Sequence, residues 1–456
     1  MDLFDASDPR PVHFMGVGGA GMNPLAAIVH ANGMSVTGCD LDPAGAADLA
    51  ARGIPVATGH DPSHVDGAQA VVVTAAVASD HPELGRAHDL GVRVIQRKRL
   101  LAELVAGSRV VGISGTHGKT TTTTMVTEAL SAAGLEPTGI TGGRVRTWRG
   151  NVKIGSPELY VVEADEYDQA LLELYPTIAV VTNVEPDHLD SYGSVAAMES
   201  AFVRFAERAE VVIAGTDDAG ANRVAQQLAG TVWSFGLGRG DLAITEVEHA
   251  PTGTSATLSV PNRGAVRLRL RVPGLHNVRN AAAAVGVVAA LDARLEPALE
   301  ALAEFEGVGR RFERVGEVGG VMVVDDYAHH PTEILATILA ARQAFPGRRL
   351  VAVFQPHLYS RTKRLGDALG EALSGADLVV VTDVYAAREL PIAGVSGEQV
   401  ANAATRAGVR TIYEPERDRL GPRVREVIQS GDVVLTLGAG DITRVGRELV
   451  EWPAVA

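Results

Sequence analysis

Three consecutive residues in the stretch VVGISGTHGKTT, residues 110–121, have the types and order that bind a triphosphate. Gly118, Lys119 and Thr120 lie between a short apolar run that predicts a strand and a segment that predicts a helix. In such a loop, backbone N–H groups cradle phosphate oxygens, the lysine neutralises their charge and the hydroxyl reaches Mg²⁺. The longer Walker A spacing would need glycine at Ile113, so the match is to the shorter G-T-x-G-K-T form. The pattern predicts ATP binding, and the alternative is a glycine-rich turn with a surface lysine.

Acidic residues follow the next predicted strand. Because ligands of open α/β sheets bind at the carboxyl ends of strands, Glu163 is placed to ligate Mg²⁺ beside the phosphates. A further strand, residues 178–182, leads to Asp187 and His188, either of which could complete a second cation site. Mg²⁺ prefers oxygen ligands, so a structural role for the histidine is the alternative.

A second glycine-rich loop precedes these motifs. Gly16, Gly18 and Gly21 fit the pattern G-x-G-x-x-G after a short apolar strand, and Asp40 follows Gly18 by about 22 residues, where a ribose-binding acid is expected. The pattern indicates a pyrophosphate next to a sugar, which NAD and UDP-sugars share. An NAD-dependent dehydrogenase and a glycine turn without a ligand are therefore alternatives. A separate ATP site favours a ligase acting on a nucleotide-linked substrate, since hydride transfer needs no second nucleotide.

Two polar segments follow strands in the last third of the chain. The segment DDYAHHPT, residues 325–332, contains adjacent histidines, His329 and His330, that point apart in regular structure and have no evident third partner. Contact with a ribose or an amine is therefore predicted there rather than zinc binding. In residues 355–364, Arg361 and its basic neighbours could hold a carboxylate or a phosphate. A solvated basic start of a helix is the alternative.

Composition excludes several classes of protein. The formal net charge of −14 argues against a broad nucleic-acid surface. With the single cysteine, Cys39, neither a disulfide framework nor a thiolate zinc site can be built within the chain. The acidic start of the chain has no signal-peptide core, and no run of about 18 apolar residues predicts a membrane span. We expect a soluble cytoplasmic protein, and either a monomer or a homodimer.

The elements that must position these residues alternate along the chain. Val/Ile-rich runs separated by Ala/Leu-rich helical segments are typical of parallel α/β sheets. Residues 241–273 instead alternate apolar and polar side chains, which predicts added antiparallel hairpins. The prediction is three α/β domains at 1–107, 108–307 and 308–456. Predicted strands are 71–73, 109–114, 160–163, 178–182, 211–214, 321–325, 350–354, 378–382 and 433–437, and predicted helices are 24–31, 120–133, 195–207, 278–291 and 332–345.

Taken together, the ordered motifs resemble the Mur ligase family over nearly the whole chain. The motifs are GVGGAGM (16–22), SGTHGKTTTT (114–123), EADE (163–166), TNVEPDHLD (182–190), GLHNVRNAAAA (274–284), GRRFE (309–313), DDYAHHPTE (325–333), FQPHLYSRT (354–362) and LGAGD (437–441). The resemblance implies a Rossmann-like UDP-binding first domain, a P-loop ATPase central domain and a Rossmann-like third domain that binds the amino acid.

The resemblance also implies roles for individual residues. ATP contacts are expected from Gly115, Thr116, His117, Gly118, Lys119, Thr120, Thr121, His276, Asn277, Asn280, Arg311 and Asp326. UDP-sugar contacts are expected from Gly18, Gly19, Ala20, Gly21, Asp40 and Thr74. Metal ligands are expected at Thr120, Glu163 and His188, and amino-acid contacts at Tyr327, His357 and Arg361. Lys119, Glu163, His188, Arg311, His357 and Arg361 are the expected catalytic set.

The activity implied is ATP- and Mg²⁺-dependent ligation of L-alanine to the carboxylate of UDP-N-acetylmuramate, through an acyl phosphate, in peptidoglycan precursor synthesis. Family members that add later residues use a carbamylated lysine in the central domain, and residues 154–240 contain no lysine. Tyr167 after EADE also occurs in members that recycle a murein tripeptide onto the same sugar, so that activity is an alternative. The opening GVGGAGM and the later FQPHLYSRT favour the alanine-adding members.

Overall fold

A computed structural model describes residues 3–5, 7–75, 77–187, 189–387 and 389–451 of the chain. The chain packs as two compact units. The first comprises Met1–Thr245, Thr257–Leu268 and Arg279–Ala303, and the second comprises Glu246–Ala256, Arg269–Val278 and Glu304–Ala456. None of the helices in the described ranges is both long and apolar enough to cross a membrane.

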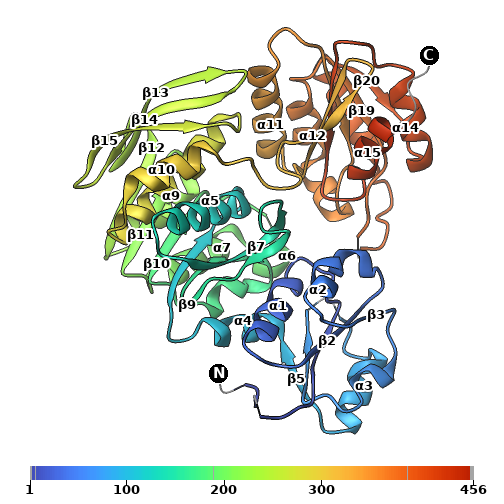
Figure 1. Ribbon diagram of the computed structural model, residues 1–456. Coiled ribbons are helices and arrows are strands. Elements are labelled where there is room, and N and C mark those ends of the chain that lie inside the picture. The colour runs from blue at the N-terminus through green and yellow to red at the C-terminus, as the bar shows by residue number, and fades with distance from the viewer. Residues whose placement is uncertain (1–2, 6, 76, 188, 388, 452–456) are drawn as a thin grey trace. The chain divides into compact units, whose positions relative to one another are not determined.

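The first unit begins with a five-stranded parallel sheet of order β3-β2-β1-β4-β5, of which β2, β3 and β5 are labelled in Figure 1. β1 and β4 are apolar and buried along their whole length, as expected of strands that helices cover on both faces. The order reverses between β1 and β4, so a ligand is expected at their carboxyl ends. The elements are β1 Val12–Met15, α1 Asn23–Ala31, β2 Val36–Asp40, η1 Pro43–Ala46, α2 Ala47–Ala51, β3 Val56–Thr58, η2 Pro62–Val65, β4 Ala70–Val73, α3 Pro82–Asp89, β5 Arg93–Gln96 and α4 Arg97–Val105.

A ten-stranded sheet of order β15-β14-β13-β12-β11-β10-β6-β9-β7-β8 follows. Its centre is parallel, with β6 paired to both β9 and β10, so these three strands end at one edge. The β region predicted at 241–273 is confirmed as three consecutive strands that are neighbours in the sheet. The strands are β6 Arg109–Ser114, β7 Pro137–Val145, β8 Gly150–Lys153, β9 Ser156–Glu163, β10 Ile178–Val181, β11 Val211–Gly215, β12 Thr231–Leu237, β13 Leu242–Ala250, β14 Gly253–Val260 and β15 Gly264–Leu270.

Helix α5 is the element that presents the triphosphate loop. It packs against β7 and α10 (Figure 1). Its first two turns are buried, and five threonines in succession follow Lys119 there. The buried hydroxyls of Thr124 and Thr127 donate to the carbonyl oxygens one turn earlier, which lets polar residues sit inside the helix interface. The helices are α5 Lys119–Ala132, η3 Tyr167–Glu173, α6 Leu189–Tyr192, α7 Val195–Ala206, α8 Ala219–Gln226, α9 Leu275–Ala290 and α10 Leu295–Ala303.

The second unit is built on a six-stranded sheet of order β16-β17-β21-β18-β19-β20. β16 and β17 form an antiparallel hairpin, and the remaining pairs are parallel. Two separate hydrophobic clusters occupy its two faces, as a doubly wound sheet requires. The elements are β16 Glu313–Val318, β17 Val321–Asp326, α11 Pro331–Ala344, β18 Leu350–Phe354, α12 Tyr359–Leu373, β19 Leu378–Val381, α13 Gly397–Arg406, β20 Arg410–Tyr413, α14 Arg417–Arg425, β21 Val433–Leu437 and α15 Thr443–Glu451.

Candidate active site

Side chains from the end of β10 hold the loop between β6 and α5. Thr182 Oγ1 donates to the carbonyl oxygen of His117 at 2.7 Å, and Asn183 Oδ1 accepts from the His117 N–H at 2.8 Å. Gly115 has a φ of +133°, and a Cβ on it would overlap Thr182 Oγ1. Glycine is therefore required at this position by both conformation and space.

Asn280, expected to contact ATP, lies against the same loop. Gly118 has a φ of +80°, and a Cβ built on it would be 2.7 Å from Asn280 Oδ1. The amide of α9 thus approaches the backbone immediately before α5. His276 and Asn277 belong to the second unit, where Asn277 Nδ2 donates to the carbonyl oxygen of Pro273 at 2.7 Å.

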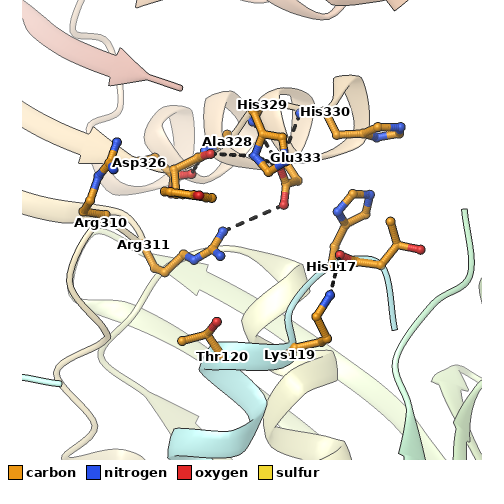
Figure 2. Close-up of polar contacts among 12 residues, drawn as sticks. His117, Lys119, Thr120, Arg310, Arg311, Asp326, Ala328, His329, His330 and Glu333 are labelled. Carbon is orange, nitrogen blue, oxygen red and sulfur yellow. Dashed lines mark hydrogen bonds and ion pairs between the residues drawn. The ribbon is translucent and has the colours of Figure 1, made fainter. Parts of the chain in front are cut away.

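Lys119, at the first position of α5, has a side chain that is 12% exposed (Figure 2). Its Nζ lies 2.7 Å from Glu166 Oε2 and donates to the carbonyl oxygen of Gly115 at 2.6 Å. Burial opposes the charged form, but the carboxylates of Glu166, Asp165 and Glu163 outweigh it, so the pKa of Lys119 is raised. Sequence reasoning did not identify Glu166 as the lysine's partner, although it belongs to the EADE motif.

Thr120 and Glu163, two of the expected metal ligands, contact each other. Thr120 Oγ1 donates to Glu163 Oε1 at 3.0 Å, and the N–H of Gly142 donates to Glu163 Oε2 at 2.6 Å. A hydroxyl and a carboxylate are the hard oxygen donors that Mg²⁺ prefers, so the donor set fits that ion. The third expected ligand, His188, lies outside the described residues.

The first glycine loop is organised by Asp40 at the end of β2. Asp40 Oδ2 accepts from the N–H of Gly18 at 2.9 Å, and its Oδ1 accepts from the N–H of Asp42 at 2.9 Å. Gly19 and Ala20 are exposed beyond this contact, while Thr74 follows the end of β4. Asp40 thus shapes the loop in which Gly19 and Ala20 are exposed.

An arginine that sequence reasoning missed lies beside this loop. Arg97 is the first residue of α4, and its Nη1 is 3.0 Å from where a Cβ on Gly21 would stand. Its Nη2 is 3.8 Å from Asp165 Oδ2. The guanidinium therefore places positive charge next to the predicted pyrophosphate loop. Arg97 is identified only by its closeness to this loop in the folded chain, since no sequence motif includes it.

In the second unit, the buried Asp326 is held at the end of β17. Its Oδ2 accepts from the N–H of Phe312 at 2.7 Å, and its Oδ1 accepts from the N–H of Ala328 at 2.8 Å. Figure 2 shows Asp326 beside Ala328. Burial raises the pKa of Asp326 to about 6, against the lowering effect of Arg311 and these two donors. Both carboxylate oxygens are therefore already engaged with the backbone.

Two adjacent arginines contact the same tyrosine. The guanidinium carbons of Arg310 and Arg311 each lie 4.9 Å from the centroid of Tyr327. Arg310 is fixed by the carbonyl oxygen of Gly438 at 2.6 Å, whereas Arg311 points toward Glu333, with Nη1 3.8 Å from Oε1 (Figure 2). Of the two, Arg311 makes the longer contact, so its guanidinium is the easier one to redirect to a ligand.

The expected amino-acid residues are joined by a row of rings. Tyr327 meets His329 with centroids 5.3 Å apart, His329 meets His357 at 6.1 Å, and His357 stacks on Tyr385 at 5.8 Å. Arg361, which is buried, has Nη1 3.2 Å from His357 Nδ1. The structure thus gathers Tyr327, His357 and Arg361, and it adds Tyr385, which the sequence patterns did not indicate.

Both units therefore present groups suited to anionic ligands. The sequence also matches three family models over most of its length: "Mur ligase family, catalytic domain" at residues 11–109, "Mur ligase middle domain" at 113–288 and "Mur ligase, glutamate ligase domain" at 310–440. The chain belongs to the Mur ligase family. The family resemblance and the three-domain α/β fold class predicted from the sequence are confirmed, whereas the domain limits and site residues stay predictions.

Individual Mur ligases are similar to this chain over nearly its full length. The UDP-N-acetylmuramate–L-alanine ligase of Cutibacterium acnes is 45% identical over 460 residues, covering 99% of this chain and 97% of that protein. The crystal structure of UDP-N-acetylmuramate–alanine ligase MurC from Thermotoga maritima matches with a TM-score of 0.82 at 30% identity, covering 97% and 98% of the two chains. A murein peptide ligase from Psychrobacter arcticus, at 24% identity and a TM-score of 0.73 with 98% and 100% covered, shares the fold.

Proposed function

We propose that this chain ligates L-alanine to the carboxylate of UDP-N-acetylmuramate with ATP, in peptidoglycan precursor synthesis. The name of the Cutibacterium acnes relative and the full-length identity of 45% support the substrates. The main structural support for ATP-dependent ligation is the grouping of Lys119, Thr120 and Glu163 around the start of α5. A cytoplasmic location and the domain limits 1–107, 108–307 and 308–456 are part of the proposal.

Lys119 is the residue proposed to neutralise the triphosphate. Its ammonium is charged and buried, and its Nζ sits among carbonyl oxygens of the loop and Glu166. An arriving phosphate would exchange these acceptors for its own oxygens, while the loop amides from Gly115 to Thr121 bind the rest of the triphosphate. Asn280, together with His276 and Asn277, is proposed for the adenine side.

The reaction has two steps, phosphoryl transfer to the sugar acid and then amide formation. A carboxylate oxygen of the muramoyl group attacks the γ-phosphorus of ATP, the bond to the β-phosphate oxygen breaks, and ADP leaves. The alanine amine then attacks the acyl carbon, a tetrahedral intermediate collapses, and inorganic phosphate leaves as the amine loses a proton. Phosphate is a better leaving group than oxide, and the protein contributes positioning and charge neutralisation.

Different groups of residues are proposed to bind Mg²⁺, the UDP-sugar, alanine and ATP. Thr120 and Glu163, with His188, would hold Mg²⁺, which neutralises phosphate charge when bound. The loop of Gly18, Gly19, Ala20 and Gly21 would contact the UDP pyrophosphate, with Asp40 shaping the loop and Thr74 at the next strand end. Tyr327, His357 and Arg361 would hold alanine's carboxylate or the acyl phosphate, and Arg311 and Asp326 would contact ATP.

Phosphate release tests the proposal. Purified protein with ATP and Mg²⁺ is incubated with UDP-N-acetylmuramate and L-alanine, glycine, L-serine or the preformed tripeptide, and product is identified by mass spectrometry. Release that requires both the sugar acid and alanine is expected. Release only with the tripeptide would assign the recycling activity, and saturable NADH binding without ligation would assign an oxidoreductase.

A further inference from the structure

A compact cluster of imidazole, thiol and carboxylate groups is formed by two strands of the N-terminal sheet and two helices beside them. It joins His13 of β1, Cys39 of β2, His64 of η2 and Glu83 of α3. One ligand atom from each of the four lies within 4.8 Å of all the others. The four positions are far apart in sequence, and the fold alone brings the chain's single cysteine together with them.

Two separations between these atoms match the edges of a metal tetrahedron. Zinc bonds of 2.0–2.3 Å place neighbouring ligand atoms about 3.3–3.8 Å apart. Cys39 Sγ lies 3.3 Å from His13 Nε2 and 3.4 Å from Glu83 Oε1. His64 Nδ1 lies 2.9 Å from Glu83 Oε1, an edge that must lengthen to admit the ion, and the remaining pairs of ligand atoms lie within 4.8 Å of one another.

The orientation of His13 suits a ligand. Its Nδ1 hydrogen-bonds Thr37 Oγ1 at 2.9 Å, and its Nε2 is directed at Cys39 Sγ. With the proton on Nδ1 and donated to the threonine, Nε2 presents its lone pair to the cluster. Metal-binding histidines are typically oriented in this way by a partner on the other ring nitrogen.

The charge balance of the cluster also favours a cation. The Glu83 side chain has no exposed surface, and within the described part of the chain its basic neighbours at 4.0 Å or less are histidines. Their nitrogens lie at 2.9 Å for His64, 3.2 Å for His60 and 4.0 Å for His81. Among the described residues no lysine or arginine lies within 4.0 Å of this buried carboxylate, so a divalent ion would bring positive charge directly beside it.

We propose that His13, Cys39, His64 and Glu83 form a site for a zinc-class transition-metal ion that braces the N-terminal domain. His60 and His81 stand beside Glu83 as further nitrogen donors. Binding releases the Cys39 thiol proton to solvent, because the thiolate is the ligand form. The carbonyl oxygen of Cys39 accepts from the N–H groups of Gly16 and Val17 at 2.8 and 3.0 Å, so the metal would stiffen the base of the first glycine loop.

The site is independent of the proposed function, and metal binding itself tests it. The full chain, with any affinity tag removed, is stripped with a chelator, dialysed and titrated with Zn²⁺ and separately with Co²⁺. We expect one zinc per chain by elemental analysis. We also expect a cobalt spectrum with tetrahedral d–d bands and a thiolate-to-cobalt charge-transfer band. Absence of stoichiometric metal, or a cobalt spectrum without the thiolate band, would overturn the site.

Substitutions locate the ion. Cys39→Ser should abolish the thiolate band, and Thr37→Val should weaken zinc binding by about 10- to 100-fold through the freed His13 ring. His88→Gln is the matched control, because His88 lies on the same helix as Glu83 with a side chain that is 92% exposed. Unchanged zinc affinity in both Cys39→Ser and Thr37→Val would place the ion elsewhere. Thermal unfolding without metal shows whether each variant folds. The cobalt spectrum of the wild-type chain tests the site even if a variant does not fold.

Discussion

The ammonium nitrogen of Lys119 lies 2.7 Å from a carboxylate oxygen of Glu166, and both side chains are almost fully withdrawn from solvent. The pair fixes the lysine at the mouth of the triphosphate loop before any nucleotide arrives. Each partner also protects the other from being a lone buried charge. Lys119 is therefore expected to bind the triphosphate and also to stabilise the fold through Glu166. A single substitution of Lys119 would change both properties at once.

Lys119→Ala is expected to abolish ligation and also to lower the free energy of unfolding by about 3–5 kcal/mol, because Glu166 is left buried without its cation. Adding Glu166→Gln should recover most of the stability while ligation stays absent. Phosphate release and urea unfolding on the two variants separate these effects. Ligation at the wild-type rate in either variant would remove Lys119 from the catalytic centre.

Glu163→Gln is expected to raise the Mg²⁺ concentration needed for half-maximal activity by at least about tenfold, because a charged oxygen donor becomes a neutral amide. Thr120→Val should have the same direction of effect, since it removes the hydroxyl that donates to Glu163 Oε1 at 3.0 Å. Magnesium titrations at saturating ATP measure the shift. If both variants keep the wild-type Mg²⁺ dependence, Thr120 and Glu163 are not the ligands.

Gly118→Ala should weaken ATP binding, since the alanine methyl would stand 2.7 Å from Asn280 Oδ1 at a φ of +80°. The left-handed conformation alone costs about 1–2 kcal/mol for a residue with a Cβ. Gly134→Ala is the matched control, since Gly134 has a φ of +91° with no atom within 4 Å of the added carbon. Equal ATP affinities in the two variants would mean that the close approach of Asn280 to residue 118 does not affect ATP binding.

Arg97→Met is predicted to raise the KM for the UDP-sugar with little change in the KM for ATP, because Arg97 lies against Gly21 of the first glycine loop. Arg99→Met, on the same helix with a side chain that is 69% exposed, is the control. Initial rates at varied UDP-N-acetylmuramate measure the effect. A KM change confined to ATP would assign Arg97 to the other nucleotide.

The buried strands and the triphosphate loop could be predicted because they depend on local sequence. Every predicted strand and helix is confirmed within a few residues, since apolar runs such as Leu350–Phe354 are buried on both faces. β7 was missed because Pro137–Val145 contains three glycines and a proline, which are atypical of strands.

What the sequence could not reveal are contacts between residues distant in the chain. Arg97 lies beside the glycine loop because α4 begins directly after β5, at the same edge of the parallel sheet as the loop that follows β1. The cluster around Glu83 has no recognisable ligand spacing, since its members come from four separate elements. The single cysteine excludes a zinc site built from thiolates alone. It does not exclude the proposed site, in which two histidines and a carboxylate supply the other three ligands.

The elevated pKa of Asp326 predicts a pH-dependent stability in the second unit. Its folded pKa of about 6 exceeds the ordinary value of 3.8, so the folded state holds a proton that the unfolded state has released between these values. The contribution of Asp326 to stability is therefore complete below pH 3.8 and is lost as the pH rises through about 6. A difference of about two units corresponds to about 3 kcal/mol.

Asp326→Asn removes this titration and isolates it from other groups. The free-energy difference between wild type and variant, from urea unfolding, should be largest near pH 4 and should shrink by about 3 kcal/mol by pH 7.5. The amide also loses one of the two acceptors for the N–H groups of Phe312 and Ala328, so the variant is less stable near pH 4, where the wild-type side chain is protonated. A difference that widens with rising pH would mean that Arg311 and the backbone donors stabilise the ionised carboxylate more than burial disfavours it.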